Sequence, residues 1–170
     1  MDISIQDWQQ PVDEWPALSA LVKRLDQVRW VSNSYFDWHL DRHLYVATSE
    51  DEPIGYILSI IQYIGDDERH DRVELDGQAL KEAKILAFGV PPERRGQGIG
   101  RQLQLFAMEA AYEEGCYQFR SRSDGEAIEN HILKKKMGFA IHPANRGEDR
   151  TSVFFVMPLR IWKQSQMLDQ

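Results

Sequence analysis

The sequence contains little cysteine, has no excess of positive charge and lacks a long apolar run. Its single cysteine, Cys116, excludes an internal disulfide framework and is typical of a reducing compartment. No window approaches the roughly 20 apolar residues that a membrane-spanning helix needs. The opening residues, MDISIQDWQQ, have no basic segment followed by an apolar core, so they do not predict a secretory signal. We therefore expect a cytoplasmic protein without a membrane partner.

The charge balance narrows the choice of partners. The formal net charge is −7, whereas contacts with nucleic-acid phosphates need a basic surface. DNA and RNA are therefore not expected as partners. An acidic protein can attract a cationic substrate through its long-range field, although the same charge also keeps a protein soluble. A cationic or amine substrate is compatible with this charge but not required by it.

The patterning predicts one α/β domain over residues 1–170, because no internal repeat or Ser/Gly linker divides the chain. Helical spacing of apolar residues or an aromatic-rich pattern predicts helices over 13–28, over 32–43, from 99 to a stop at Gly115, and over 125–137 before Gly138. Strands are predicted over 44–50, 54–63, 84–90, 116–122, 139–143 and 151–159, with a turn at Asp76-Gly77. The late strand–helix–strand order predicts a parallel pair in a mixed, mostly antiparallel sheet flanked by helices.

A glycine-rich stretch, RRGQGIG (residues 94–100), directly follows the apolar strand KILAFGV and Pro91-Pro92. A phosphate-binding Walker loop needs Gly-Lys-Ser/Thr at its end, but Arg101 follows Gly100. A dinucleotide fingerprint needs a third glycine where Arg101 stands. Two interpretations remain for this stretch. It is either a tight turn without a ligand or an anion site formed by backbone N–H groups at the start of a helix.

Two neighbouring features suit an anionic ligand that also carries amides. Three arginines, at 94, 95 and 101, surround the loop and match an anion with more than one charge. Gly89 lies inside the preceding apolar strand and indicates a bulge or a splayed edge. A splayed strand leaves backbone groups unpaired, and an amide-bearing ligand could pair with them as an extra strand would.

The string from Val90 to Gly100, VPPERRGQGIG, resembles the acyl-CoA-binding motif of the GNAT superfamily of N-acetyltransferases. That motif runs Arg/Gln-x-x-Gly-x-Gly/Ala and is met here by Arg95, Gly98 and Gly100. The later stretch GEAIENHILKKKMGFAIHP is similar to a family helix that ends in Gly-Phe, and the resemblance covers roughly residues 44–158. It implies a GNAT-like fold with a splayed parallel strand pair. It also implies transfer of an acetyl group from acetyl-CoA to a primary amine by direct attack in a ternary complex.

The resemblance implies a set of cofactor-binding residues. Backbone N–H groups of residues 97–101 would hold the CoA pyrophosphate, and the backbone of Phe88 and Val90 would pair with the pantetheine amides. Asn130 is included because the family often has a pantetheine-binding Asn in the same helix, although the register differs here. The whole predicted set is Phe88, Gly89, Val90, Arg95, Gly96, Gln97, Gly98, Ile99, Gly100, Arg101 and Asn130.

The catalytic residues are less defined by the resemblance. The family usually has a Tyr near the thiol sulfur, four residues before the Gly of Gly-Phe, where this chain has Lys134. Lys134 or an ordered water would then give the thiolate its proton, unless Lys134 belongs to a solvated helix face with its lysine neighbours. Glu82, near the cofactor strand, is a candidate general base, with a solvent-exposed acid as the alternative. The N–H of Val90 would meet the oxyanion.

The remaining candidates concern the acceptor and the assembly. Trp30, Tyr35, Phe36 and Trp38 would form one wall of the acceptor site or pack the core. The acidic run 66–68 could attract an amine or form a solvated turn. The five histidines show no metal-ligand spacing, so no metal is predicted. A small-molecule or peptide amine is the expected substrate. The strand SVFFVMPL could support a homodimer, although a buried strand has the same pattern. A CoA-binding module without turnover and a ligand-free interaction domain remain as alternatives.

Overall fold

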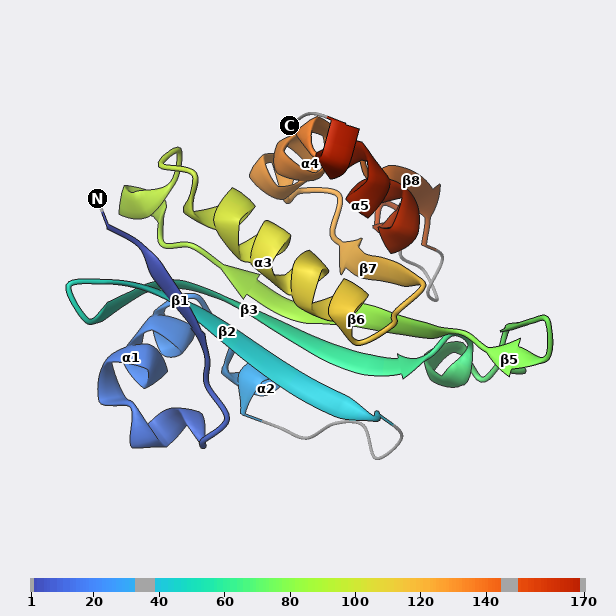
Figure 1. The fold of residues 1–170 in the computed structure, drawn as a ribbon. Helices are drawn as coiled ribbons and strands as arrows, with labels where there is room; N and C mark the ends of the chain where they lie inside the picture. The colour runs from blue at the N-terminus through green and yellow to red at the C-terminus, as the bar shows by residue number, and fades with distance from the viewer. Residues whose placement is uncertain (1, 33–38, 145–149, 169–170) are drawn as a thin grey trace. The chain divides into compact units, whose positions relative to one another are not determined.

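The computed structural model describes residues 2–32, 39–144 and 150–168. The chain divides into two compact units, the first made of residues 1–60 and 86–107 and the second of residues 61–85 and 108–170. Three elements contribute residues to both units (Figure 1): β3 (Glu52–Tyr63), β6 (Lys81–Gly89) and α3 (Ile99–Glu113).

The first unit combines two helices with the N-terminal strands. Its own elements are β1 (Ser4–Asp7), η1 (Val12–Glu14), α1 (Pro16–Arg24), α2 (Val28–Val31), β2 (Asp41–Ser49) and η3 (Pro92–Arg94). Strand β1 pairs antiparallel with β2. Pro16 opens α1 with the backbone angle that a first helical turn needs. Leu18 and Val22, four residues apart on α1, join Leu44 and Tyr56 in one buried apolar cluster.

The second unit carries the other half of the sheet. Its own elements are η2 (Asp66–Glu68), β4 (Glu74–Leu75), β5 (Gln78–Ala79), β7 (Gln118–Ser123), α4 (Ile128–Lys136), β8 (Ala140–Pro143), β9 (Val153–Pro158) and α5 (Leu159–Leu168). Strands β7, β9 and β8 are antiparallel neighbours. The strand order of the seven-stranded sheet is β1-β2-β3-β6-β7-β9-β8, and β4-β5 form a separate hairpin.

The parallel strand pair is present and it splays. Strands β6 and β7 pair in parallel from Glu82 opposite Gln118 to Ile85 opposite Ser121. Strand β6 continues to Gly89 beyond this pairing, and β7 continues to Ser123. The predicted fold class, a mixed and mostly antiparallel sheet with one splayed parallel pair, is therefore confirmed.

Local turn chemistry explains several element boundaries. Asp76 and Gly77 both have positive φ, at 52° and 74°, so the predicted turn between β4 and β5 is confirmed. The turn between β2 and β3 lies at Glu50 and Asp51, which also have positive φ. Gly138, at φ 85°, follows α4 where a helix stop was expected. Within the described part of the chain, no helix is both long and apolar enough to cross a membrane.

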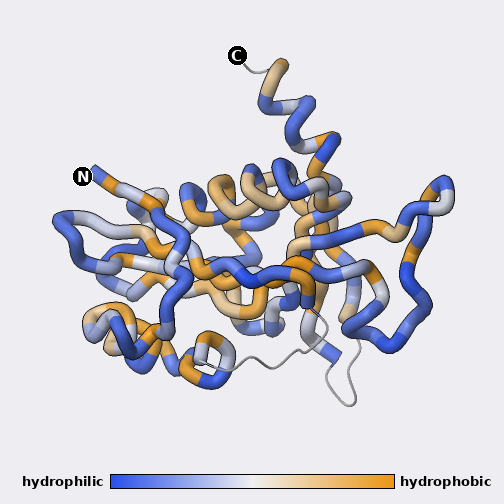
Figure 2. Tube along the Cα trace, turned by 60° about the horizontal axis from the view of Figure 1, so that its bottom comes forward, coloured by the Kyte–Doolittle hydropathy of each residue, from blue (hydrophilic) through white to orange (hydrophobic). Residues whose placement is uncertain are grey.

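Some sequence predictions were wrong. Residues 41–43, expected in a helix over 32–43, begin strand β2; residues 33–38 of that segment lie outside the described chain. The helix expected over 13–28 is interrupted at Asp26, whose φ is 55°, and becomes α1 and α2. Helix α5 was missed because hydrophilic residues are interspersed along it (Figure 2). Strand β9, which carries the SVFFVMPL stretch, pairs with β7 and with β8, and its role in a homodimer stays a prediction.

Candidate functional site

The glycine-rich loop lies in the first unit, between η3 and α3. Gly96 and Gly98 have φ of 75° and 82°, values that side-chain-bearing residues rarely adopt, and the space beside each Cα is open. Glycine is therefore required at these two positions by the backbone conformation, and not by a lack of space for a side chain. The N–H of Gln102 donates the first bond of α3 to the Gly98 carbonyl, at 3.0 Å. The amides of residues 99–101 precede that bond, so they lie at the positive end of the helix without an intrahelical acceptor.

Side chains of the loop tie it to the end of β6. Arg95, although exposed, donates from Nε to the Val90 carbonyl at 3.1 Å. Gln97 donates to the Glu93 carbonyl at 3.2 Å, and Glu93 pairs with Arg24 at 2.8 Å. Arg95, a residue of the loop, thus also fixes the backbone at the end of β6.

Gly89 allows the turn between α1 and α2 to pack directly on β6. A Cβ at position 89 would lie 2.6 Å from Leu25 Cδ1 and 3.1 Å from Tyr56 Cζ. Gln27, in the same turn, donates from Nε2 to the Phe88 carbonyl at 3.2 Å and accepts from the Tyr56 hydroxyl at 3.0 Å. Burial raises the pKa of the Tyr56 phenol, so this group stays a neutral donor. Close approach explains the glycine at this position.

Lys134 is fully buried in the second unit, so its assignment to a solvated helix face was wrong. Its neighbours Lys135 and Lys136 are exposed, as that interpretation expected. The Lys134 Nζ lies 4.5 Å from the ring centre of Phe139 and 5.8 Å from that of Phe119. Burial lowers the pKa of Lys134 from 10.5 to about 7. The amine can therefore exchange a proton near neutral pH.

Glu82 is also fully buried, which rules out the solvent-exposed alternative. Its Oε1 accepts from Gln62 at 2.9 Å and from Arg120 Nη2 at 2.6 Å. Its Oε2 accepts from Gln118 at 2.7 Å and from Arg120 Nε at 3.0 Å. Both carboxylate oxygens therefore accept hydrogen bonds. Because Gln118 and Arg120 lie on β7, these bonds link β6 to β7.

The acidic turn at residues 66–68 is neutralised by the chain's own cations. Asp67, 3% exposed, pairs with Lys84 and, at 2.8 Å, with Arg120. Burial acts to raise the pKa of Asp67, but the bonds and charges of Lys84 and Arg120 outweigh it and lower the pKa. Asp66 pairs with Arg72 at 3.0 Å. The two aspartates are thus engaged in ion pairs within the protein.

A family model described as the Acetyltransferase (GNAT) family matches residues 4–139, which is most of the chain. The chain belongs to the GNAT acetyltransferase family. No curated protein sequence matches it significantly.

Solved structures share the fold of this GNAT chain. Arabidopsis thaliana NAA60 in complex with acetyl-CoA is 18% identical, with a TM-score of 0.69 over 94% of this chain and 99% of that one. The Escherichia coli ribosomal-protein-S18-alanine N-acetyltransferase is 16% identical, with a TM-score of 0.62 over 93% and 94%. A Bacillus subtilis acetyltransferase in complex with CoA is 18% identical, with a TM-score of 0.60 over 92% and 99%. At these identities the likeness establishes the fold.

Asn130 of the GNAT chain lies on α4, facing the end of β7. Its Nδ2 donates to the Ser123 hydroxyl oxygen at 3.0 Å, and His131 Nε2 lies 3.2 Å from the same oxygen. Among the described residues, the buried Oδ1 of Asn130 has no hydrogen-bond partner. The side chain thus has an acceptor available, while its donor is engaged with the protein.

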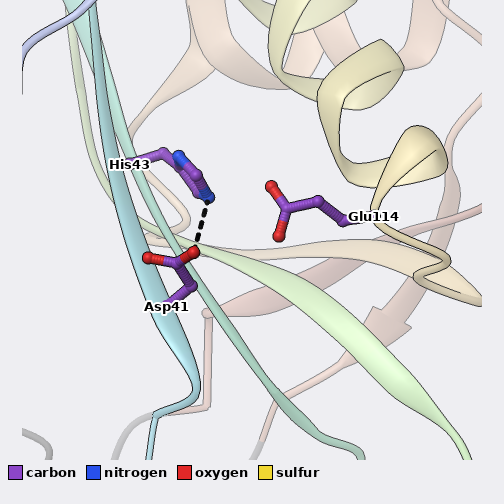
Figure 3. Close-up of side chains that lie close together, drawn as sticks. All are labelled: Asp41, His43 and Glu114. Carbon is purple, nitrogen blue, oxygen red and sulfur yellow. Dashed lines mark ion pairs between the residues drawn. The ribbon is translucent and has the colours of Figure 1, made fainter.

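The structure of the GNAT chain also describes three residues that the sequence analysis considered: Cys116, His43 and Trp30. Burial raises the pKa of the Cys116 thiol to about 12, so the thiolate is scarce at neutral pH. His43 lies on β2 rather than a helix, and its Nδ1 is 2.7 Å from Asp7 Oδ2. Figure 3 shows its ion pair with Asp41, whose Oδ2 lies 3.7 Å from His43 Nε2. Trp30 is 41% exposed, with Arg29 over its ring. Its predicted companions Tyr35, Phe36 and Trp38 lie outside the described residues.

Sequence reasoning missed Gln27 and Tyr56 of the GNAT chain altogether. Gln27 is separated from Phe88 by 61 positions and from Tyr56 by 29. No local pattern marks such a contact. The only signal in the sequence was Gly89, because a glycine inside an apolar strand can also indicate close approach of another segment.

Proposed function

We propose that this GNAT protein transfers an acetyl group from acetyl-CoA to a primary amine by direct attack in a ternary complex. The loop at residues 95–101 carries the proposal, because two glycines with positive φ lead into three helix-start amides without intrahelical acceptors. A doubly charged diphosphate suits such a cluster of N–H groups. The Arabidopsis and Bacillus relatives, which share the fold, were solved with acetyl-CoA and CoA.

The amides of residues 97–101 hold the pyrophosphate, and the backbone of Phe88 and Val90 pairs with the pantetheine amides. Gly96 leaves the loop without a Cβ, and Gly89 lets the turn between α1 and α2 pack against the strand that holds the pantetheine. Arg95 supports this arrangement by fixing the Val90 carbonyl at 3.1 Å. Asn130 contributes its available Oδ1 as an acceptor for a ligand N–H. The Val90 N–H stabilises the negative charge that develops on the thioester oxygen.

In the transfer itself, the lone pair of a neutral amine attacks the thioester carbonyl carbon. The carbon–sulfur bond breaks, the amine nitrogen passes a proton to a general base or to water, and the thiolate takes a proton from an acid. Lys134 supplies the thiolate proton in this proposal, because a donor whose pKa is about 7 is partly protonated at neutral pH. Glu82 can act as general base toward the amine only if one of its present donors leaves.

The glycine loop offers a matched test of cofactor binding. Gly98→Ala places a side chain at φ 82°, and Gly77→Ala imposes the same type of strain at φ 74° in the turn between β4 and β5, with open space at both sites. We expect similar losses of stability, but loss of acetyl-CoA affinity in calorimetry only for Gly98→Ala. Equal affinities in the two variants would contradict the assignment of the loop.

Release of free thiol across a panel of amines tests turnover. The second candidate function is a CoA-binding module without turnover, favoured by the replacement of the family's usual Tyr by Lys134. Saturable acetyl-CoA binding with no thiol release for any amine would establish that module and exclude the transferase. Absence of both binding and release would leave a ligand-free domain.

A further inference from the structure

A serine and a histidine lie within hydrogen-bond reach of each other in the second unit. Ser123 is the last residue of β7 and His131 lies on α4, and the distance from the serine hydroxyl oxygen to His131 Nε2 is 3.2 Å. Asn130 Nδ2 donates to the same oxygen at 3.0 Å. Ser123 is buried, whereas Asn130 and His131 are half-buried, so the pair lies at the margin of the core.

The bond from Asn130 fixes the direction of the Ser123 hydroxyl proton. A serine hydroxyl has one hydrogen to donate and two lone pairs that accept. Because Asn130 Nδ2 is a donor, its bond uses one of the lone pairs. Within residues 2–32, 39–144 and 150–168, His131 Nε2 is the one acceptor for the hydroxyl proton, and buried polar hydrogens are nearly always bonded. This arrangement needs the neutral imidazole with its proton on Nδ1, and its Nε2 can then take the serine proton.

The surrounding fold holds both side chains in place. Ser123 is opposite Val153 of β9 in the antiparallel pairing, which fixes its backbone. The His131 N–H bonds the Ala127 carbonyl at 3.0 Å at the start of α4. The imidazole packs edge-on against the buried ring of Phe155, with 5.2 Å between ring centres. A base that is held within reach of a hydroxyl is the arrangement that activates a serine as a nucleophile.

The local sequence has the form of a serine at a strand-to-helix turn, where β7 leads into α4 (Figure 1). Small residues lie two positions before and two positions after Ser123, in the string SRSDG over 121–125. Hydrolases with a nucleophilic serine at such a turn have the related pattern Gly-x-Ser-x-Gly. Gly125 has a packing reason here, because its Cβ would lie 2.8 Å from Thr151 Cβ. Ser123 differs from the strained elbow of those hydrolases, since its φ is not positive.

We propose that Ser123 is a nucleophile, that His131 is its general base, and that the protein hydrolyses activated acetyl esters through an acetyl-serine intermediate. Ser123 Oγ attacks the ester carbonyl carbon while its proton passes to His131 Nε2. The bond from that carbon to the leaving group breaks, and the leaving group takes the proton from the imidazolium. Water then attacks the acetyl-serine and gives a proton to His131, which returns it to the Ser123 oxygen as acetate leaves. This activity goes beyond the proposed transfer and needs neither CoA nor an amine.

The surroundings of His131 predict a slow reaction with a burst. Among the side chains that the structure describes, no carboxylate bonds His131 Nδ1, so the imidazolium lacks the partner that it has in a Ser-His-Asp triad. A nitrophenolate is a better leaving group than a serine alkoxide, so acetylation of Ser123 should be faster than its hydrolysis. Accumulation of the acyl-enzyme then appears as a burst of product.

The test uses the full chain and p-nitrophenyl acetate, with neither CoA nor an amine present. We expect a burst of p-nitrophenolate that approaches the amount of protein, followed by slow release. After an acid quench, the intact mass should show one added acetyl group, and peptide mass spectrometry should place it on Ser123. Absence of a burst, or an acetyl group on a lysine with none on Ser123, would overturn the proposal.

Variants assign the two roles. Ser123→Ala should abolish the burst, whereas Ser121→Ala removes another buried hydroxyl from β7 and should leave the burst unchanged. His131→Gln keeps an N–H group but has no base, so the burst should slow by about 100-fold or more. A burst that persists in Ser123→Ala, or an unchanged rate in His131→Gln, would contradict the pair. If melting shows that Ser123→Ala does not fold, the acetylated position in the natural protein and the His131→Gln rate decide.

The outcomes separate this inference from the proposed function, which thiol release from acetyl-CoA in the presence of an amine tests. Acetylation of Ser123 without thiol release for any amine would overturn the transferase alone. Thiol release in a protein whose Ser123 is never acetylated would overturn this inference alone.

Discussion

Replacing Lys134 with methionine should stabilise the protein near neutral pH and slow the proposed reaction. The lysine is fully buried between aromatic rings, and burial lowers its pKa from 10.5 to about 7. This difference corresponds to roughly 4–5 kcal/mol, at about 1.4 kcal/mol for each tenfold change. Methionine has a similar length and no charge. Its imperfect packing reduces the gain in the free energy of unfolding by about 1 kcal/mol. We expect a net gain of roughly 3 kcal/mol at pH 6–7.

The stability difference between Lys134→Met and the natural protein depends on pH, because Lys134 binds its proton less tightly in the folded state. Between pH 7 and 10.5 the unfolded chain binds more protons at this position than the folded chain. The free energy of unfolding of the natural protein therefore rises with pH across this window relative to that of Lys134→Met. The stability difference is largest at and below pH 7 and closes as the pH approaches 10.5.

Urea denaturation at half-unit steps from pH 6 to 10 measures this difference. Lys135→Met, at an exposed neighbouring position, is the matched control and should change stability by less than about 0.5 kcal/mol at every pH. The reasoning is refuted if the natural protein and Lys134→Met have parallel stability curves over this range.

Activity provides the second half of the test. If the Lys134 ammonium gives the thiolate its proton, kcat should fall as the pH rises through about 7, and Lys134→Met should lack this fall. Lys134→Tyr introduces the hydroxyl that the family usually has at this position. This variant should recover turnover, and its kcat should fall at a higher pH than that of the natural protein. Unchanged turnover and pH profile in Lys134→Met would exclude Lys134 as the acid.

Three further predictions concern the surrounding structure. Asp67→Asn should destabilise the protein by about 3–5 kcal/mol at pH 7 in urea denaturation, because it removes the buried negative charge that pairs with Lys84 and that shares Arg120 with Glu82; since the pKa of Asp67 is lowered on folding, the difference should shrink as the pH falls below 3.8. Gly89→Ala should cost about 1–3 kcal/mol and lower turnover, since its Cβ would meet Leu25 at 2.6 Å, and unaltered melting would contradict this packing. Because β3, β6 and α3 contribute residues to both units, we propose that residues 1–170 unfold as one domain; separate transitions by circular dichroism and tryptophan fluorescence would show otherwise.

Local patterns were sufficient for the order of most elements and for the cofactor loop as a hypothesis. Strand length, apolar runs and glycine stops are properties of neighbouring residues, so the parallel pair β6–β7 and the end of α4 were predicted correctly. Strand β1, with four residues, and the polar-interrupted helix α5 were too weak as patterns. Residues 41–43 became a strand because their pairing in the sheet is not a local property.

By itself, the sequence determined the glycine-rich helix start and the family resemblance that the family model bears out. Only the tertiary structure decided that Lys134 is buried among aromatic rings, that Glu82 is held by Arg120, and that Gln27 reaches the Phe88 carbonyl. The physical reason is that burial and hydrogen-bond partners come from residues far apart in the chain. Backbone conformation, in contrast, is set largely by adjacent residues.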